Sequence, residues 1–366
     1  ADPRAIFTVE IAQLPGSGEK KEKKSDLTAQ VPLDKKIRYG KLDNGFTYYI
    51  RNNKKPENMI QFRLVSNAGS IMERDDQQGL AHFCEHMAFN GTKNLPGKQM
   101  IEYLETIGVQ FGYNLNAFTS WDCTEYMIKD CPITPENLDL ALLILHDWSQ
   151  FIALDPAEID EERGVIMEEL RTRDGANLRA QNDMFRNLFK GTIYEHRNLI
   201  GYLDGLKSFD HTALEGFYKK WYRPEYQAIV IVGDIDVDQV EAKLKALMAD
   251  IPASPADAAQ KEVVYVPATE EPIISVFADR ELTQSSVMMF ARREALPKQF
   301  NNTQVGYAYN IVYNLATMMM NNRFEEITQK ADAPFLGGGM SEGSIGVCPT
   351  MDATSFSVVA HEGRII

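Results

Sequence analysis

Three residues that can do chemistry together stand within one short segment, in the order His-x-x-Glu-His: His82, Glu85 and His86. At 3.6 residues per turn, positions i, i+3 and i+4 share one face of a helix, so two imidazoles and a carboxylate would point at the same spot. Imidazole nitrogens bind zinc, and a carboxylate beside the metal can take a proton from water. The inverted order of the motif is typical of one class of zinc metalloproteases.

Histidines at this spacing also occur as ordinary surface or core residues. Here Asn90-Gly91 ends the predicted helix. Its other positions are mostly apolar: Leu80, Ala81, Phe83, Met87, Ala88, Phe89. Burying three ionisable groups without partners would be unfavourable by several kcal/mol. A bound metal ion is therefore the simpler interpretation. The remaining histidines have no comparable context, and we interpret them as ordinary: His146, His196, His211, His361.

A catalytic zinc site needs three protein ligands and one open position, so a third ligand must come from elsewhere. The best source is the predicted acidic helix that contains Glu162, Glu168 and Glu169. Glu162 and Glu169 are two turns apart and share a face, whereas Glu168 is rotated by about 100°. One carboxylate could bind the metal while a second supports it. A solvated helix face is the alternative interpretation of these residues.

The elements that must position these residues follow from hydrophobic periodicity and turn signals. Asn44-Gly45 between two strand-like runs predicts a β-hairpin, and residues 59–66 alternate as a further strand. Thr134-Pro135 is typical of a helix start, with the threonine as N-cap and the proline at the first helical position. The predicted strands are Ile37–Lys41, Phe46–Arg51, Met59–Ser66, Glu125–Ile128 and the buried strand Gln227–Gly233; the predicted helices are Pro96–Ile107, Pro135–Ile152, the helix opened by Asp155-Pro156, Leu214–Tyr222 and Val237–Met248.

The predicted organisation comprises a peripheral, charged N-terminal arm (1–34), a catalytic α+β domain (35–251), a linker (252–262) and a second unit (263–366). We expect strands at Ile273–Phe277, Ser286–Ala291 and Ala353–Ala360, and a helix at Val305–Thr328. Their order echoes the first unit but lacks His-x-x-Glu-His. This predicts a degenerate, non-catalytic duplicate, and one that is shorter than the first and looks truncated.

Composition narrows the class of protein. The 366 residues have a formal net charge of −14, which argues against a nucleic-acid partner, because phosphate contacts need clustered Lys and Arg. No run of 18 apolar residues is present, so we expect no membrane span. The four cysteines are too few and too scattered for a disulfide scaffold, and we expect them to be reduced or buried: Cys84, Cys123, Cys131, Cys348.

Four stretches together resemble the insulinase (pitrilysin, mitochondrial processing peptidase) family of metallopeptidases. The first is His82–Thr92, with the inverted zinc motif, and the second is Asn116–Ser120, similar to an Asn-Ala-x-Thr strand beside the metal. Glu162–Glu169 resembles the helix with the distal ligand. Phe217–Pro224 together with Ile231–Asp234 resembles the end of the first domain. The resemblance runs from about Lys36 to Ala360.

The resemblance implies a duplicated, mitochondrial-processing-peptidase-like α+β fold, in which an antiparallel sheet packs against helices, and one Zn²⁺ per chain. Glu85 would be the general base and Glu162 a supporting carboxylate. Asn116 and Ala117 would lie on an edge strand that binds a peptide substrate by its backbone. The implied zinc ligands are His82, His86 and Glu169, and Phe89 and Phe118 would line the pocket beside the scissile bond, with plain core aromatics as the alternative for these two.

Three expectations remain open at this stage. The separation between His86 and Glu169 is longer than the family leads us to expect, so Glu168 stays as the alternative ligand. Family members close the chamber with a second half, in the same chain or in a partner subunit, which these residues do not cover. The resemblance and the start at Ala1–Arg4 indicate a periplasmic or exported bacterial protein. A zinc endopeptidase is the preferred interpretation; a non-catalytic subunit and a zinc hydrolase of small molecules are the alternatives.

Overall fold

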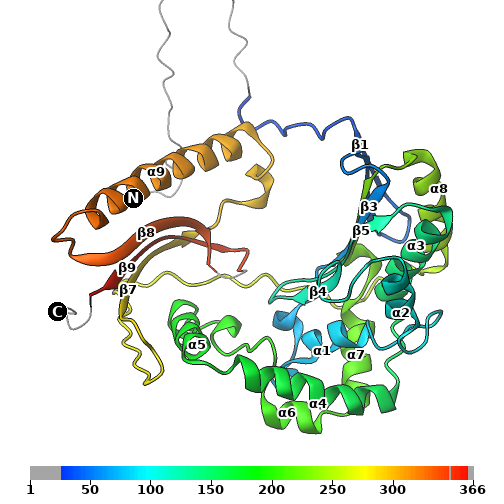
Figure 1. Ribbon diagram of the computed structural model, residues 1–366, viewed down its shortest axis with the longest axis horizontal. Helices are drawn as coiled ribbons and strands as arrows, with labels where there is room; N and C mark the ends of the chain where they lie inside the picture. Colours follow the sequence, from blue (N-terminus) through cyan, green and yellow to red (C-terminus); the bar gives the residue numbers. More distant parts are fainter. Residues whose placement is uncertain (1–25, 346–347, 362–366) are drawn as a thin grey trace, which may run out of the picture.

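The structure is a computed structural model that describes residues 26–345 and 348–361. The charged run Ser17–Ser25, predicted to be a solvated arm, lies outside the described residues. Figure 1 shows a large sheet with its helices on one side of the molecule and a smaller sheet with the long helix α9 on the other. Helices and strands are both abundant, which confirms the α+β class.

The large sheet has six strands in the order β1-β2-β6-β3-β5-β4. Neighbouring strands are antiparallel except for β2 and β6, which run parallel, so the sheet is mixed rather than purely antiparallel. The predicted hairpin is present, with Gly45 at φ 97° in its turn. The strands are β1 Ile37–Lys41, β2 Thr47–Asn52, β3 Met59–Ser66, β4 Leu115–Thr119, β5 Thr124–Pro132 and β6 Gln227–Gly233.

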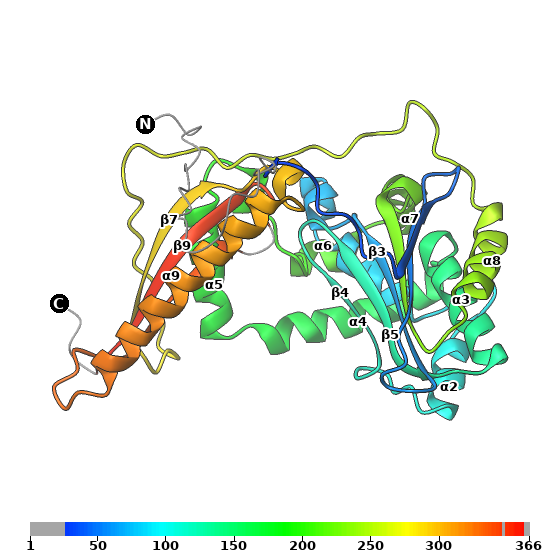
Figure 2. The same ribbon diagram turned by 90° about the horizontal axis from the view of Figure 1, so that it is seen from above.

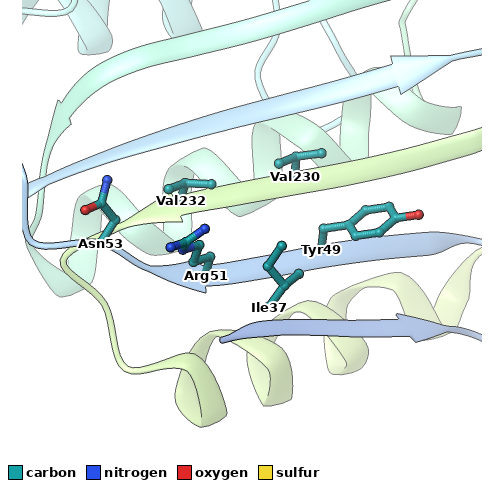
Figure 3. A pocket seen from close by; sticks show the side chains of 6 residues that line it. All are labelled: Ile37, Tyr49, Arg51, Asn53, Val230 and Val232. Atoms are coloured by element: carbon teal, nitrogen blue, oxygen red, sulfur yellow. The ribbon is translucent and has the colours of Figure 1, made fainter. Parts of the chain in front are cut away.

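One face of this sheet is buried beneath helices and the other is more open. In β3, Ile60, Phe62 and Leu64 are fully buried, as the alternation predicted. The predicted buried strand β6 is present, with alternate residues buried and the residues between them half-buried. The open face has a shallow hollow (Figure 3), and none of its lining side chains is an imidazole, thiol or carboxylate: Ile37, Tyr49, Arg51, Asn53, Val230, Val232.

The helices begin where their capping residues predict. Thr134 accepts a hydrogen bond from the backbone N–H of Asn137 at 3.1 Å, and Asp155 accepts one from Ala157 at 2.8 Å. No helix among the described residues has the length and apolar character to cross a bilayer. The helices of this part of the chain are α1 Leu80–Met87, α2 Gln99–Thr106, α3 Pro135–Gln150, α4 Pro156–Arg173, α5 Ala176–Leu188, α6 Leu203–Ser208, α7 His211–Trp221 and α8 Val237–Leu247.

The core beneath the sheet fixes the C-terminal end of α1. Trp148 of α3 is fully buried, and its indole N–H donates to the backbone carbonyl of Ala88 at 2.9 Å. Its ring stacks on Tyr126 of β5 and meets Phe89 edge-on, with centroids 5.1 and 5.6 Å away. The motif helix therefore ends against an aromatic core that joins α3 to β5. All four cysteines are free, and three of them are buried, as the sequence predicted.

The smaller sheet has the order β7-β9-β8, built from β7 Ser286–Glu294, β8 Phe335–Ser344 and β9 Met351–Ala360. The helix α9 Gln304–Thr328 lies between β7 and β8 in the chain and beside their sheet (Figure 2). The first unit repeats this plan, because β3 is followed by helices and then by β4 and β5, with the order β3-β5-β4. The shared topology agrees with the predicted duplication.

One sequence expectation in this region was wrong, and one strand was not predicted. Ile273–Phe277 forms no strand, and Ile274 and Val276 are 86% and 91% exposed. An apolar alternation forms a strand only where a neighbour accepts its backbone hydrogen bonds. Conversely, β8 has no strand signal in its sequence, because its run of three glycines has low strand propensity, yet it pairs along β9. The boundaries at residues 251 and 263 stay a prediction.

The N-terminal arm is partly fixed, although its described residues 26–34 are exposed. The backbone N–H of Val31 donates to Asn302 at 2.6 Å, and that of Val305 donates to Leu27 at 2.9 Å. The arm therefore contacts the segment that starts α9, which its charge pattern did not indicate.

A close backbone crossing sets the start of α1. Gly79, the residue before the helix, has φ 99°, a conformation that side chains disfavour. A Cβ at this position would lie 2.4 Å from the carbonyl oxygen of Ile200 and 3.0 Å from Gly201. The carboxylate of Glu73 accepts the backbone N–H groups of Gly79 and Ala81 at 3.1 and 2.8 Å. These contacts fix the entry of the chain into the motif helix.

We predict that Gly79→Ala lowers the free energy of unfolding by more than about 2 kcal/mol, because it combines a left-handed backbone with a clash against a neighbouring backbone. Gly216→Ala is the matched control, since no atom lies within 4 Å of its added Cβ in the exposed face of α7. This control should be neutral or stabilising by up to about 1 kcal/mol. Urea unfolding measures the free energy of unfolding of both variants. Equal stabilities would contradict the steric role given to Gly79.

A buried polar network holds the loop that follows α1. Asp147 of α3 accepts the hydroxyl of Thr92 at 2.6 Å, and the backbone and side-chain amides of Asn94 at 3.0 and 2.8 Å. His146 lies between Asp147 and Asp250, at 2.9 and 2.8 Å. Burial alone would lower the pKa of His146, but its hydrogen bonds to these two carboxylates outweigh burial and raise it. This histidine, interpreted from sequence as ordinary, thus connects α3 to the end of the first unit.

The raised pKa of His146 predicts a pH-dependent stability. A histidine whose folded pKa exceeds its unfolded value stabilises the protein fully below about pH 6.5, and this contribution is lost as pH rises through the folded pKa. His146→Gln should therefore be destabilised by about 1–3 kcal/mol at pH 6 and by less at alkaline pH. His196→Gln, at an exposed histidine, is the control. A constant difference between His146→Gln and the parent from pH 6 to 9 would contradict this linkage.

Candidate metal centre

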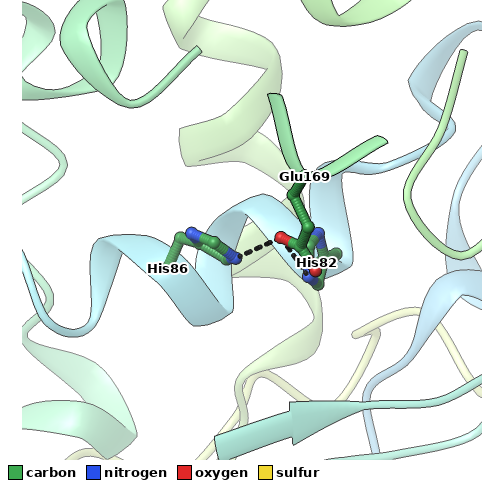
Figure 4. Close-up of side chains that lie close together, drawn as sticks. All are labelled: His82, His86 and Glu169. Carbon is green, nitrogen blue, oxygen red and sulfur yellow. Dashed lines mark ion pairs between the residues drawn. The ribbon is translucent and has the colours of Figure 1, made fainter. Parts of the chain in front are cut away.

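Three predicted ligands lie together in the structure. His82 and His86 project from α1, and Glu169 reaches them from α4 (Figure 4). The Oε2 atom of Glu169 lies 3.2 Å from Nε2 of His86 and 3.7 Å from Nε2 of His82. One ligand atom from each of the three residues lies within 4.8 Å of the others. Glu169 is 83 residues after His86 and 87 residues after His82 in the chain, and the packing of α4 on α1 brings the three side chains together.

This geometry fits a tetrahedral metal ion. Two donor atoms that are each about 2.1 Å from a tetrahedral zinc ion lie about 3.4 Å apart, close to the two separations given above. Two imidazole nitrogens and one carboxylate oxygen are also a donor set that catalytic zinc sites use, with a fourth position left for water or substrate. Without a cation, the buried imidazole of His82 would face Glu169 and another imidazole, with no donor or acceptor for its Nδ1.

The alternative ligand Glu168 lies elsewhere. Its side chain is 60% exposed and pairs with Arg171, one turn further along α4, at 2.6 Å. Glu169 instead uses its two oxygens on different partners, since Oε1 pairs with Arg173 at 2.6 Å while Oε2 faces the imidazoles. Its hydrogen bond to His86 is the main cause that lowers the pKa of Glu169, so this carboxyl is ionised. The geometry favours Glu169.

Glu85 lies on the same face of α1 and is not among the converging ligand atoms. Burial raises the pKa of its carboxyl, while a hydrogen bond donated by the hydroxyl of Thr119 works against that shift. Thr119 is the last residue of β4, so the sheet edge orients this carboxylate. A carboxylate with a raised pKa and a fixed orientation can accept and return a proton near neutral pH.

The two imidazoles have different surroundings. Nδ1 of His86 lies 2.7 Å from Oε1 of Glu162, so the hydrogen of this imidazole is held on Nδ1 and Nε2 is free as a ligand atom. Hydrogen bonds to Glu162 and Glu169 outweigh burial and raise the pKa of His86 to about 9 in the absence of a metal. Burial lowers the pKa of His82, whose Nδ1 has no partner. Glu162 thus lies beside a ligand, where the sequence placed a supporting carboxylate.

A cavity of about 490 Å³ opens beside the three ligand atoms. Its walls come from α1, α2, α4 and β4, and β4 is the edge strand of the large sheet. Asn116 and Phe118 of β4 are exposed, Ala117 is half-buried, and all three line the cavity. The lining includes every predicted substrate-binding residue: Asn116, Ala117, Phe118, Phe89. Phe89 is also 6% exposed and packed in the aromatic core.

Sequence reasoning missed several residues of this site. Thr119 was within the motif Asn116–Ser120 but had no assigned contact, and Asn90 was interpreted only as a helix stop. Lys98 and Arg173 gave no signal, because isolated basic residues are common on surfaces. Thr119 hydrogen-bonds Glu85, and Arg173 pairs with Glu169. Asn90 hydrogen-bonds Glu162, the neighbour of His86, and Lys98 hydrogen-bonds Asn90. Only their positions in space identify them.

Two models of one peptidase family match the chain. Insulinase (Peptidase family M16) matches residues 48–198, and Peptidase M16 inactive domain matches residues 208–329, so together they span well over half of the chain. The chain belongs to the insulinase family, peptidase family M16. The match confirms the resemblance drawn from the four motifs. The first model includes His82, His86 and Glu169, and the second model includes none of these three residues.

Curated relatives include the "Probable zinc protease PqqL" of Escherichia coli, 31% identical over 93% of this chain and 36% of that protein. The Haemophilus influenzae protein of the same name is 33% identical over 81% of this chain and 32% of its own length. The chain therefore spans about a third of the length of these relatives. The first half of the periplasmic protease PqqL from E. coli has a similar structure, with a TM-score of 0.82 and 30% identity over 91% of this chain and 70% of that one.

The geometry generates a prediction about ligand identity. Glu169→Gln should weaken zinc binding by more than about 100-fold, because an amide is a poor ligand and would also lose the pairing with Arg173. Glu168→Gln is the matched control, since it removes the same charge from the adjacent residue, and it should bind zinc as the parent does. Competition with a chromophoric chelator measures both. Weaker zinc binding in the Glu168 variant than in the Glu169 variant would reverse the assignment.

Proposed function

We propose that the chain holds the catalytic centre of a zinc-dependent endopeptidase that cleaves peptides or unfolded polypeptide segments. The observation that supports this most is the convergence of His82, His86 and Glu169, with Glu85 on the same helix face, beside an edge strand. Family membership and relatives named as zinc proteases agree with it. One zinc ion per chain, bound by these three side chains, completes the proposed site.

A zinc ion held by His82, His86 and Glu169 would supply Lewis-acid polarisation of the scissile carbonyl and would lower the pKa of the attacking water. Glu85 accepts the proton of that water at its carboxylate and returns it to the nitrogen of the leaving amine. Thr119 keeps the carboxylate of Glu85 oriented, and burial raises the pKa of that carboxyl, which makes it a better proton acceptor. Glu162 holds His86 through Nδ1.

The substrate would bind as an additional strand on β4. β4 is an edge strand of the large sheet, and its backbone groups alternate between β5 and the free edge. Ala117 faces the free edge, where its N–H donates to the side-chain oxygen of Asn116 at 2.9 Å, so a substrate strand would pair with Ala117 in place of this local hydrogen bond. Such pairing would place the peptide backbone along the cavity. It would depend on an extended peptide backbone rather than on particular side chains. Phe89 and Phe118 would contact side chains near the scissile bond.

The remaining parts of this proposal concern the whole protein. Members of the family act with two halves, and this chain spans about a third of the length of the curated relatives described above, so we propose that a further half or a partner subunit closes the chamber. A relative described as a periplasmic protease supports an exported, periplasmic location.

We predict that Glu85→Gln retains zinc but lowers the rate of peptide cleavage by at least about 10²–10⁴-fold, because the amide cannot accept the proton of water. Glu161→Gln, on the exposed side of α4, removes the same charge and should leave the rate unchanged. Both are compared in the natural full-length protein with a peptide library. Parent-like cleavage by the Glu85 variant would rule out its role as the base.

The same assay distinguishes the two alternative functions. A non-catalytic subunit would contain far less than one zinc per chain, or would show no cleavage that a chelator abolishes. A zinc hydrolase of small molecules would bind zinc but leave every peptide intact while cleaving small esters or amides. Chelator-sensitive peptide cleavage with one zinc per chain is the result we expect.

A further inference from the structure

A chain of polar contacts extends from His86 away from the metal centre. Glu162 is buried, and its two oxygens have different partners: Oε1 faces Nδ1 of His86 at 2.7 Å, and Oε2 accepts the side-chain amide of Asn90 at 2.5 Å. The carbonyl oxygen of that amide accepts a hydrogen bond from the ammonium of Lys98. Asn90 is 5% exposed and follows α1, and Lys98 precedes α2.

The order of these partners allows a single arrangement of donors and acceptors. An ammonium group has only donors, so Lys98 requires the oxygen of the Asn90 amide to face it. The NH₂ group then faces Glu162 and donates to Oε2. A carboxylate is an acceptor only, so Oε1 requires the hydrogen of His86 to be on Nδ1. The lone pair of Nε2 is left for the metal, on the side of Glu169.

We propose that Asn90 and Lys98 are positioning residues for the zinc ligand His86. They touch neither His86 nor the ligand atoms, and they act through Glu162 by fixing its rotamer and its acceptor role. The proposal deepens the proposed function and rests on zinc binding at this site. Outer partners of this kind raise the affinity of metal sites by about 10–100-fold.

The second histidine shows that this support is selective. Nδ1 of His82 is buried and has no hydrogen-bond partner among the described residues. Its imidazole is packed on the buried face of α1, and its Nε2 faces Glu169 at 3.7 Å. Of the two imidazole ligands, His86 is thus the one whose tautomer is set by hydrogen bonding, which is why changes at Asn90 and Lys98 should affect the metal.

The test measures zinc affinity, not activity. Asn90→Leu removes the amide at similar size, and Lys98→Met removes the donor at an exposed residue where the fold should tolerate it. We expect zinc to bind about 10-fold more weakly to each, by chelator competition. Lys98→Arg should restore most of the affinity. The matched control is Lys93→Met, which loses the same charge in the same loop, where Lys93 lies over the ring of Phe151, and should bind zinc as the parent does.

A double variant and a spectroscopic readout make the test specific. In a Glu162→Gln background, Asn90→Leu should cause little further loss of affinity, because both changes interrupt the same contact. The visible spectrum of the Co²⁺-substituted protein should change in the Asn90 and Lys98 variants but not in Lys93→Met. Parent-like zinc affinity in Lys98→Met and Asn90→Leu would overturn the proposal, as would equal losses in Lys93→Met.

These outcomes are separable from the failure of the proposed function. If the parent binds zinc through His86 and the Asn90 and Lys98 variants weaken it, the positioning role stands even where no peptide is cleaved. If the parent cleaves peptides and the variants bind zinc unchanged, the proposed function stands and the positioning role fails.

Discussion

The contact between α1 and α4 is the interaction on which the rest of the site depends. Burying His82, Glu85 and Glu162 is unfavourable unless each meets a partner of complementary charge or a metal. Glu169 and Glu162 provide the carboxylates, and the imidazoles provide the opposing groups. Because these groups are shielded from water, a shift of α4 along α1 would leave several of them unpaired. The packing of the two helices is therefore constrained by electrostatics as well as by apolar contact.

The surrounding structure fixes α1 at both ends. At its start, the crossing of Gly79 and Gly201 and the carboxylate of Glu73 determine where the helix begins. At its end, Trp148 binds the backbone of Ala88, and Asp147 holds the following loop. β4 adds the last constraint, because Thr119 reaches Glu85 from the sheet edge. A short helix of eight residues is thus held rigid by groups from several distant segments.

The shared topology of the two sheets places the site within the family plan. Both follow strand, helix, strand, strand, with the last strand in the middle. Among the described helices that follow the matching strands β3 and β7, α1 carries His-x-x-Glu-His, whereas α9 contains no histidine. In the second unit that helix is α9, whose side chains are mostly exposed. The two units therefore share a chain path, and they differ in the side chains that the helix after the matching strand carries.

The sequence by itself determined the local parts: the helical face of His82, Glu85 and His86, the caps at Thr134 and Asp155, and the alternation of β3. Each depends on residues a few positions apart, so periodicity and turn chemistry are enough. The family resemblance assigned the metal to Glu169, where helix spacing alone left open which of Glu162 and Glu169 would bind it. Only the tertiary structure decided what depends on distant segments: Glu169 facing the imidazoles, Thr119 on Glu85, and the contacts of Asn90 and Lys98. Periodicity along one helix cannot show which neighbour its side chains will meet.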